Sequence, residues 1–174
     1  AGTYAEKGII INKPLILMGI GQPVLEGEHK YEIITILSDH VIIQGFVLQH
    51  SGYSSMNDLA AIRLKNVAHV AIRNNRLINN FFGIYCQHAD SSVISNNQVS
   101  SVGESELGSG NGIHAWKSDR LVIANNSITG HRDGIYFEFV TNSVISKNNS
   151  SKNLRYGLHF MFSHSDTYVK NIFS

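Results

Sequence analysis

The stretch Ser92-Val93-Ile94-Ser95-Asn96-Asn97 decides the fold, because its short apolar run closed by asparagine returns along the chain. The closing asparagines step by 22, 29 and 22 residues, at Asn75, Asn97, Asn126 and Asn148. A second marker, a glycine followed by Ile or Leu, steps by 29, 22 and 23 residues, at Gly83, Gly112, Gly134 and Gly157. Two independent markers with one period indicate stacked copies of one supersecondary unit.

This repeat predicts an all-β protein, a right-handed parallel β-helix with rungs of about 22 residues. We expect a single domain over residues 1–174, with irregular rungs at 1–59 and regular rungs at 60–174. Because the chain opens within repeat material and stops within a rung, we expect it to be a piece of a longer solenoid.

The composition argues against nucleic-acid binding. The 174 residues carry a net charge of +1 and only 16% are charged, so the chain lacks the basic stripe that such binding needs. A hydrophobic fraction of 43% is enough for a continuous core. The single cysteine, Cys86, falls at an inward position of a predicted strand, so we expect a buried thiol.

Each rung is expected to contain two strands, one after the marker glycine and one before the marker asparagine. The asparagine closes its strand because it tolerates the left-handed backbone of a sharp turn. Asparagine side chains stacked one rung apart can also hydrogen-bond along the solenoid axis.

Strand alternation turns every second residue after the marker glycine outward, and stacking aligns these residues into columns. One column contains Arg63, Tyr85, His114, Tyr136 and His159. The next contains Lys65, Gln87, Trp116, Glu138 and Met161. Vertical neighbours lie roughly 4.8 Å apart, so a compact exposed patch is predicted on the last three rungs. Its members are His114, Trp116, Tyr136, Glu138, His159 and Met161.

Imidazole and thioether groups together suit copper, and thioether favours the cuprous ion. His159 and Met161 on one strand, with Glu138 on the next, could supply three ligand atoms. His114 could share the ion only if its side chain leaned past Tyr136. Two other interpretations stay open: aromatic ladders that simply cap the sheet, and a platform of aromatic rings that stack on sugars.

Two arginines, Arg132 and Arg155, also stack, and they repel unless an anion lies between them. Asp133 is adjacent and could neutralise them. They either extend into solvent or anchor an acidic partner surface or substrate.

The two 29-residue steps contain extra segments, residues 51–58 and 101–110. Insertions in solenoids form loops, often beside a binding face, although these two could equally be idle surface loops.

The outer columns hold one carboxylate, Glu138, and no Ser-His-Asp, P-loop or Cys-x-x-Cys pattern appears. We therefore expect no catalytic residues and no enzyme. The alternative is a β-helix that binds or modifies polysaccharides, by lyase-like or epimerase-like chemistry.

Three runs, residues 132–139, 148–150 and 153–163, resemble the NosD family of periplasmic accessory proteins in nitrous oxide reductase maturation. The opening, residues 8–19, 23–27 and 41–46, resembles the carbohydrate-binding-and-sugar-hydrolase (CASH) type of β-helix with which that family begins. The resemblance implies a periplasmic protein without catalysis of its own. It implies as partners nitrous oxide reductase, the ATPase and membrane subunits of an ABC transporter, and a copper chaperone.

With this resemblance, the exposed patch is interpreted as a site of transient cuprous copper capture, with His159, Met161, His114 and Glu138 as candidate ligands. Those ligands are inferred from the chemistry of the side chains. Two further groups are expected to shield the site or contact the partner. They are the rings of Tyr85, Trp116 and Tyr136, and the charged set of Arg132, Asp133 and Arg155.

Overall fold

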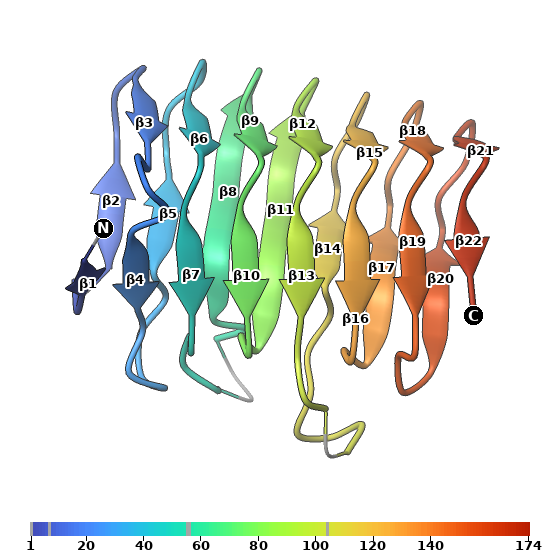
Figure 1. Ribbon diagram of the computed structural model, residues 1–174. Coiled ribbons are helices and arrows are strands. Elements are labelled where there is room, and N and C mark those ends of the chain that lie inside the picture. Colours follow the sequence, from blue (N-terminus) through green and yellow to red (C-terminus); the bar gives the residue numbers. More distant parts are fainter. Residues whose placement is uncertain (1, 7, 55–56, 104) are drawn as a thin grey trace.

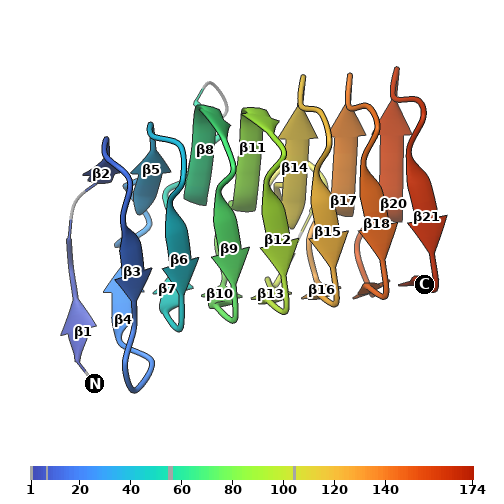
Figure 2. The same cartoon turned by 90° about the horizontal axis from the view of Figure 1, so that it is seen from above.

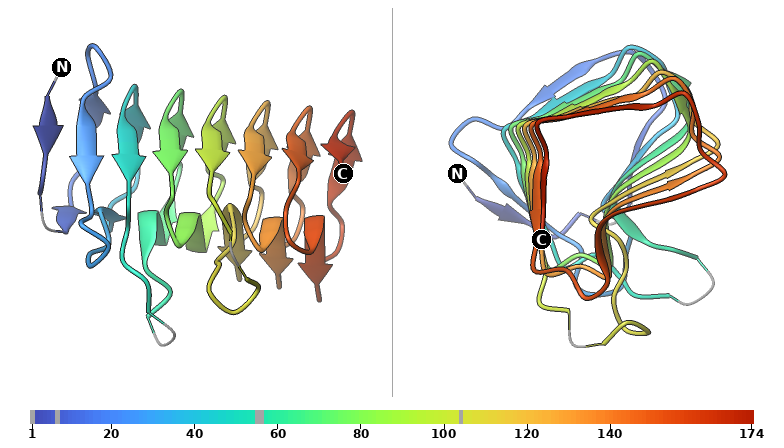
Figure 3. Two further views of the ribbon diagram at one scale, coloured as in Figure 1. Left: turned by 60° about the horizontal axis from the view of Figure 1, so that its bottom comes forward. Right: turned by 90° about the vertical axis from the view of Figure 1, so that its right-hand side faces the viewer.

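The computed structural model describes residues 2–6, 8–54, 57–103 and 105–174. In these ranges the strands form three sheets in which every pairing is parallel (Figure 1). Viewed along its axis, the chain winds around three walls, and the two inserted segments project from one side (Figure 3). The predicted parallel β-helix is therefore confirmed.

The strands succeed one another along the axis in chain order (Figure 2). Sheet A contains β1 (Thr3–Tyr4), β4 (Val24–Glu26), β7 (Val47–Gln49), β10 (Arg76–Ile78), β13 (Gln98–Ser100), β16 (Ser127–Thr129), β19 (Asn149–Ser151) and β22 (Ile172–Phe173). Sheet B contains β2 (Ile9–Ile11), β5 (Ile34–Ile36), β8 (Ala60–Ala68), β11 (Phe82–Asp90), β14 (Ile113–Trp116), β17 (Asp133–Glu138) and β20 (Tyr156–Met161). Sheet C contains β3 (Ile16–Met18), β6 (Ile42–Gln44), β9 (Ala71–Arg73), β12 (Val93–Ser95), β15 (Val122–Ala124), β18 (Val144–Ser146) and β21 (Thr167–Val169).

The marker asparagines form a buried ladder of side-chain amides. The Oδ1 atom of Asn97 accepts hydrogen bonds from the backbone N (3.1 Å) and the Nδ2 atom (3.2 Å) of Asn75. Its own Nδ2 donates to the Ile72 carbonyl at 2.9 Å. The same pattern continues through Asn126, Asn148 and Asn171. The expectation that these amides bond along the axis is confirmed.

The prediction that the marker asparagines themselves adopt the left-handed backbone conformation is wrong. The left-handed backbone lies at the residue before each of them, in Asn74, Asn96, Asn125, Lys147 and Lys170, with φ between 55° and 56°. The marker asparagine itself is there for its buried amide, which satisfies backbone groups that the sharp turn leaves unpaired.

Each regular rung also has a third strand that the sequence analysis missed, namely β10, β13, β16 or β19. Each of these strands has a single buried residue between flanking residues that reach the surface. One inward position is too short for alternation to be recognised. The marker glycines have a steric role, because a Cβ on Gly83 would lie only 2.4 Å from the Gly112 carbonyl oxygen.

The core is a continuous column of aliphatic side chains, in which Ile84, Ile113 and Ile135 are fully buried. Cys86 is also fully buried, as expected, and burial raises the pKa of its thiol to about 12. Phe160 points inward but is exposed, because β20 is an edge strand of sheet B. Within the described ranges, no helix has the length and apolar character needed to cross a membrane.

The ladder predicts that Asn126→Ala is strongly destabilising. The substitution removes four hydrogen bonds and leaves buried donors of Asn97 and a carbonyl of Ile94 unpaired. Each such group costs about 1–3 kcal/mol, so we expect a loss of at least about 3 kcal/mol in chemical denaturation. The matched control is Asn125→Ala, an exposed neighbour with left-handed φ, where about 1 kcal/mol is expected. Equal losses of unfolding free energy in the two variants would show that the hydrogen bonds of the ladder add no stability of their own.

Candidate functional site on the outer face of sheet B

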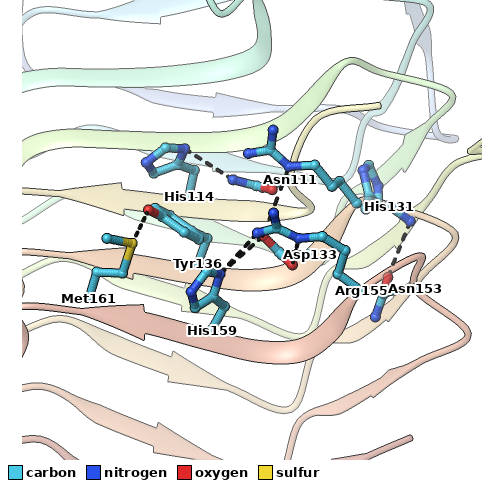
Figure 4. A network of polar contacts seen from close by, with 10 residues as sticks. Asn111, His114, His131, Asp133, Tyr136, Asn153, Arg155, His159 and Met161 are labelled. Atoms are coloured by element: carbon cyan, nitrogen blue, oxygen red, sulfur yellow. Dashed lines mark hydrogen bonds and ion pairs between the residues drawn. The ribbon is translucent and has the colours of Figure 1, made fainter. Parts of the chain in front are cut away.

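Strand pairing confirms the outward columns of sheet B. Tyr85 pairs with His114, His114 with Tyr136, and Tyr136 with His159. Successive ring centroids are 4.7, 4.8 and 4.8 Å apart, and Figure 4 shows the last three of these rings, His114, Tyr136 and His159. The second column pairs Trp116 with Glu138 and Glu138 with Met161. Side chains from distant parts of the sequence thus become neighbours, as predicted.

The first column is buried at Tyr85 and His114, although both were predicted to lie on the exposed face, and this corrects the prediction. Tyr85 and His114 are only 7% and 9% exposed, because Phe82 packs edge-on against both rings and Arg63 lies over Tyr85. Burial raises the pKa of Tyr85 to about 12 and lowers the pKa of His114 to about 3. Tyr85 therefore cannot serve as a surface contact for a partner, and the imidazole of His114 stays neutral.

The two imidazoles of the column do not converge on one point. The ring of Tyr136 lies between them and meets each one edge-to-face, at 69° and 86°. In residues 2–6, 8–54, 57–103 and 105–174, no three His, Cys, Asp or Glu side chains are grouped so that they could hold a metal ion. A metal site on this face would therefore need a donor of another kind, such as the thioether of Met161.

Asp133 is completely buried, and it organises the charged residues around it. Arg155 donates to its two carboxylate oxygens from Nε (3.1 Å) and Nη2 (2.7 Å), while Arg132 Nε lies 3.9 Å away and makes no hydrogen bond. The single carboxylate thus balances the charge of Arg155, and the expectation that it could neutralise both arginines holds for Arg155 alone. Hydrogen bonding to Asp133 also raises the pKa of Arg155. Asp133 itself cannot touch a partner, because none of its surface is accessible.

His159 lies beside this charged group. Its Nδ1 is 3.4 Å from the Asp133 carboxylate and 3.1 Å from Arg155 Nη2 (Figure 4). Met161 occupies the next outward position along β20 after His159. Its sulfur accepts a hydrogen bond of 3.0 Å from the Tyr136 hydroxyl. An imidazole and a thioether are thus held side by side on the same strand.

Trp116 faces away from these donors. Its ring packs against His88, with a centroid distance of 5.0 Å, and Lys117 Nζ lies 4.4 Å above it. The indole is therefore held by its own rung and the one before it.

The two inserted segments turn part of this face into a cleft of about 360 Å³. They contribute Tyr53, Asp58 and Leu107 to its lining, and they touch where the Tyr53 hydroxyl donates to the Leu107 carbonyl at 3.4 Å. The strand side contributes Phe81, Phe82, His114, Arg132, Tyr136 and Glu138. Except for the residues of the patch and Arg132, none of these was a predicted site residue. For Tyr53, Asp58 and Leu107 the only sequence signal was the extra length of the two rungs, and Phe81 and Phe82 had none.

Two residues that line the cleft carry buried polar atoms without partners, namely His114 Nε2 and Arg132 Nε. Asn111, which is not part of the lining, approaches His114 Nδ1 with its Nδ2 at 3.3 Å, and its Oδ1 is buried and makes no hydrogen bond. Buried polar groups in proteins are normally paired, so these atoms indicate a place where a ligand or water completes the structure.

A family model described as the right handed beta helix region matches residues 60–174. The chain belongs to this family. The matched residues coincide with the rungs that are regular in sequence, and the three sheets continue without a break into the earlier rungs. No curated protein matches the chain at a significant level. Right-handed β-helix membership establishes the fold, and the function must be argued from the outer face of sheet B.

Burial of histidines makes this β-helix less stable in acid. Two histidines are held neutral by burial, His114 with a pKa of about 3 and His131 with a pKa of about 4, against 6.5 when unfolded. Below pH 6.5 the unfolded chain therefore binds more protons than the folded one, and stability falls as the pH falls. Each histidine accounts for about 2 kcal/mol between pH 7 and pH 5. Denaturant titrations of His114→Gln should show about half of this pH-linked loss, and an unchanged pH profile would contradict the buried neutral imidazole.

The buried carboxylate should couple strongly to its arginine. A double-mutant cycle with Asp133→Asn and Arg155→Gln is expected to give a coupling energy of about 1–3 kcal/mol in chemical denaturation. The matched control is the Asp119–Arg120 pair at a turn, where Arg120 is largely exposed and less than about 1 kcal/mol is expected. Similar values for the two pairs would mean that burial of Asp133 adds nothing.

Proposed function

We propose that this protein is a periplasmic accessory protein for assembly of the copper centres of nitrous oxide reductase. It binds cuprous copper transiently on the outer face of sheet B and acts by docking to other proteins, without catalysis of its own. The proposed partners are nitrous oxide reductase, a copper chaperone, and the ATPase and membrane subunits of an ABC transporter. The likeness of residues 132–139 and 153–163 to the NosD family supports this assignment.

The observation that carries the copper role is the pair of donors on β20. His159 and Met161 occupy adjacent outward positions, and both reach solvent, with Met161 37% exposed. Imidazole and thioether suit the cuprous ion, and Glu138 on the paired strand adds a carboxylate beside Met161. His114 is withdrawn into the cleft and leaves this donor set.

Asp133 supports His159 as a ligand. Metal-binding histidines commonly donate their second ring N–H to a carboxylate, which fixes the ring and raises its basicity. The contacts of His159 Nδ1 with Arg155 Nη2 (3.1 Å) and with Asp133 (3.4 Å) belong to different tautomers, because the guanidinium can only donate and the carboxylate can only accept. In the tautomer in which Nδ1 donates to Asp133, the lone pair of Nε2 is left for a metal ion. Metal binding at Nε2 therefore requires this second tautomer, in which Arg155 bonds to Asp133 alone.

An open site with few donors suits transient binding, because an assembly factor must release its metal. The thioether already accepts a hydrogen bond from Tyr136, which leaves it as a weak ligand. For docking, Arg132 is the better cation, since its guanidinium lies farther from Asp133 than that of Arg155 does.

Anaerobic titration with cuprous ion tests the proposal. We expect one bound ion per chain, with affinity lowered at least about tenfold by His159→Ala and by Met161→Leu, since each removes one of very few ligands. The matched control is Met18→Leu, which alters an exposed thioether on sheet C.

Binding that is absent, or that is insensitive to both β20 substitutions, would remove copper handling from this face. Turnover of oligouronides that is lost in Arg155→Ala would instead favour a polysaccharide-modifying β-helix.

A further inference from the structure

We infer that the corner after sheet A holds a second metal site, in which the imidazoles of His29 and His50 bind a divalent cation such as Zn²⁺. His29 follows β4 and His50 follows β7, and these two strands pair in sheet A (Figure 1). β19, which leads into the copper donors on β20, lies four strands from β7, roughly 19 Å along the axis at about 4.8 Å per strand. The inference therefore does not rest on the copper role.

The first argument is a carboxylate that orients His50. The Nδ1 atom of His50 lies 3.1 Å from both side-chain oxygens of Glu26. Burial alone would raise the pKa of Glu26, but hydrogen bonds from its neighbours lower it, so the group is ionised near pH 7. A carboxylate can only accept, so Nδ1 carries a proton and the lone pair of the neutral ring lies on Nε2. Histidines that bind metals commonly donate their other ring N–H to a carboxylate in this way.

The second argument is the position of His29. Its ring stacks on that of His50, with the centroids 4.5 Å apart and the planes tilted by 27°. The backbone holds the pair together, because His29 N donates to the His50 carbonyl at 2.8 Å and both residues turn with left-handed φ angles of 56° and 57°. Two nitrogens bound to one zinc ion lie roughly 3.3 Å apart, from bonds of about 2.0–2.1 Å at a tetrahedral angle. Small side-chain rotations bring the two rings to this separation.

The third argument is access and charge. Both imidazoles line a second cleft of about 280 Å³, so an ion can enter from solvent. Water and the serine hydroxyls that share this lining can complete the coordination. Residues 26–30 contain two acids and one lysine, so this turn is net negative and attracts a cation.

The donor set selects the class of ion. Among the described residues that line this cleft, none has a sulfur atom, so the site lacks the thioether that favours the cuprous ion on β20. Imidazole nitrogens suit zinc and cupric ions. Glu26 stays behind His50, so the ion has two protein ligands. This agrees with the absence, in the described ranges, of any group of three His, Cys, Asp or Glu side chains that could hold a metal ion.

A second stacked pair of histidines provides the matched control. The rings of His40 and His69 have centroids 5.1 Å apart and nearly parallel planes, at 9°. The neighbouring carboxylate of Asp39 accepts from the Ala68 backbone N instead of from a ring. Stacking is thus common to both pairs, whereas the carboxylate behind the ring belongs to His50.

Zinc titration against a chromophoric competitor tests this inference. We expect one zinc ion per chain, bound at least about tenfold more weakly after His29→Gln or His50→Gln, because each substitution removes one of two nitrogen ligands. Glu26→Gln should weaken zinc binding by about 10–100-fold while both imidazoles stay in place. His69→Gln should leave the affinity unchanged.

Nuclear magnetic resonance of the unaltered protein gives a test that needs no variant to fold. One equivalent of zinc should move the ring signals of His29 and His50 and leave those of His40 and His69 in place. The inference is overturned if zinc does not bind, if the signals of His29 and His50 stay in place, or if His69→Gln weakens zinc binding as much as His50→Gln does. His159→Ala should bind zinc normally, and His50→Gln should keep its cuprous affinity, so failure here is separate from failure of the copper role.

Discussion

The structure depends on the requirement that a sharp turn inside a solenoid must satisfy its own backbone groups. The asparagine ladder meets it by placing one amide per rung where it accepts from the rung before and donates to a buried carbonyl. Water cannot reach these positions, so an apolar residue there would leave several polar groups unpaired. The ladder also fixes the vertical alignment of successive rungs. A slip of one residue in β17 would turn Tyr136 and Glu138 into the core and bring the buried Phe137 out.

On this rigid frame, two insertions change the chemistry of one wall. Without them, the column from Arg63 to His159 would be an exposed stripe of mixed polar and aromatic side chains. With them, its middle becomes a cleft with a neutral imidazole, while its end on β20 stays open to solvent. One column therefore contains two environments, a sheltered one at His114 and an open one at His159.

The sequence predicted the architecture and the vertical register well, because both follow from period and strand alternation. The contacts of Tyr136 with His114 and His159 needed nothing more than counting from the marker glycines. Prediction from the sequence failed where contacts between side chains determine burial and loop conformation. The third strand of each rung has too few inward residues to recognise. The burial of Tyr85 depends on how Phe82 and Arg63 pack against its ring, and that of Asp133 on neighbours such as Arg155. The cleft could not be predicted from the sequence, because loop conformation does not follow from repeat length. The copper and partner assignments remain predictions.

The placement of Cys86 has a consequence for soft-metal chemistry on this protein. The only thiol of the chain is sealed in the core, and burial keeps it protonated at physiological pH. No thiolate on this chain can therefore trap a cuprous ion or cross-link to a partner's cysteine. An ion arriving on the outer wall meets only nitrogen, thioether and oxygen donors, whose bonds exchange readily. The surface is chemically suited to passing such an ion on, and oxidation of a sulfhydryl cannot disable it.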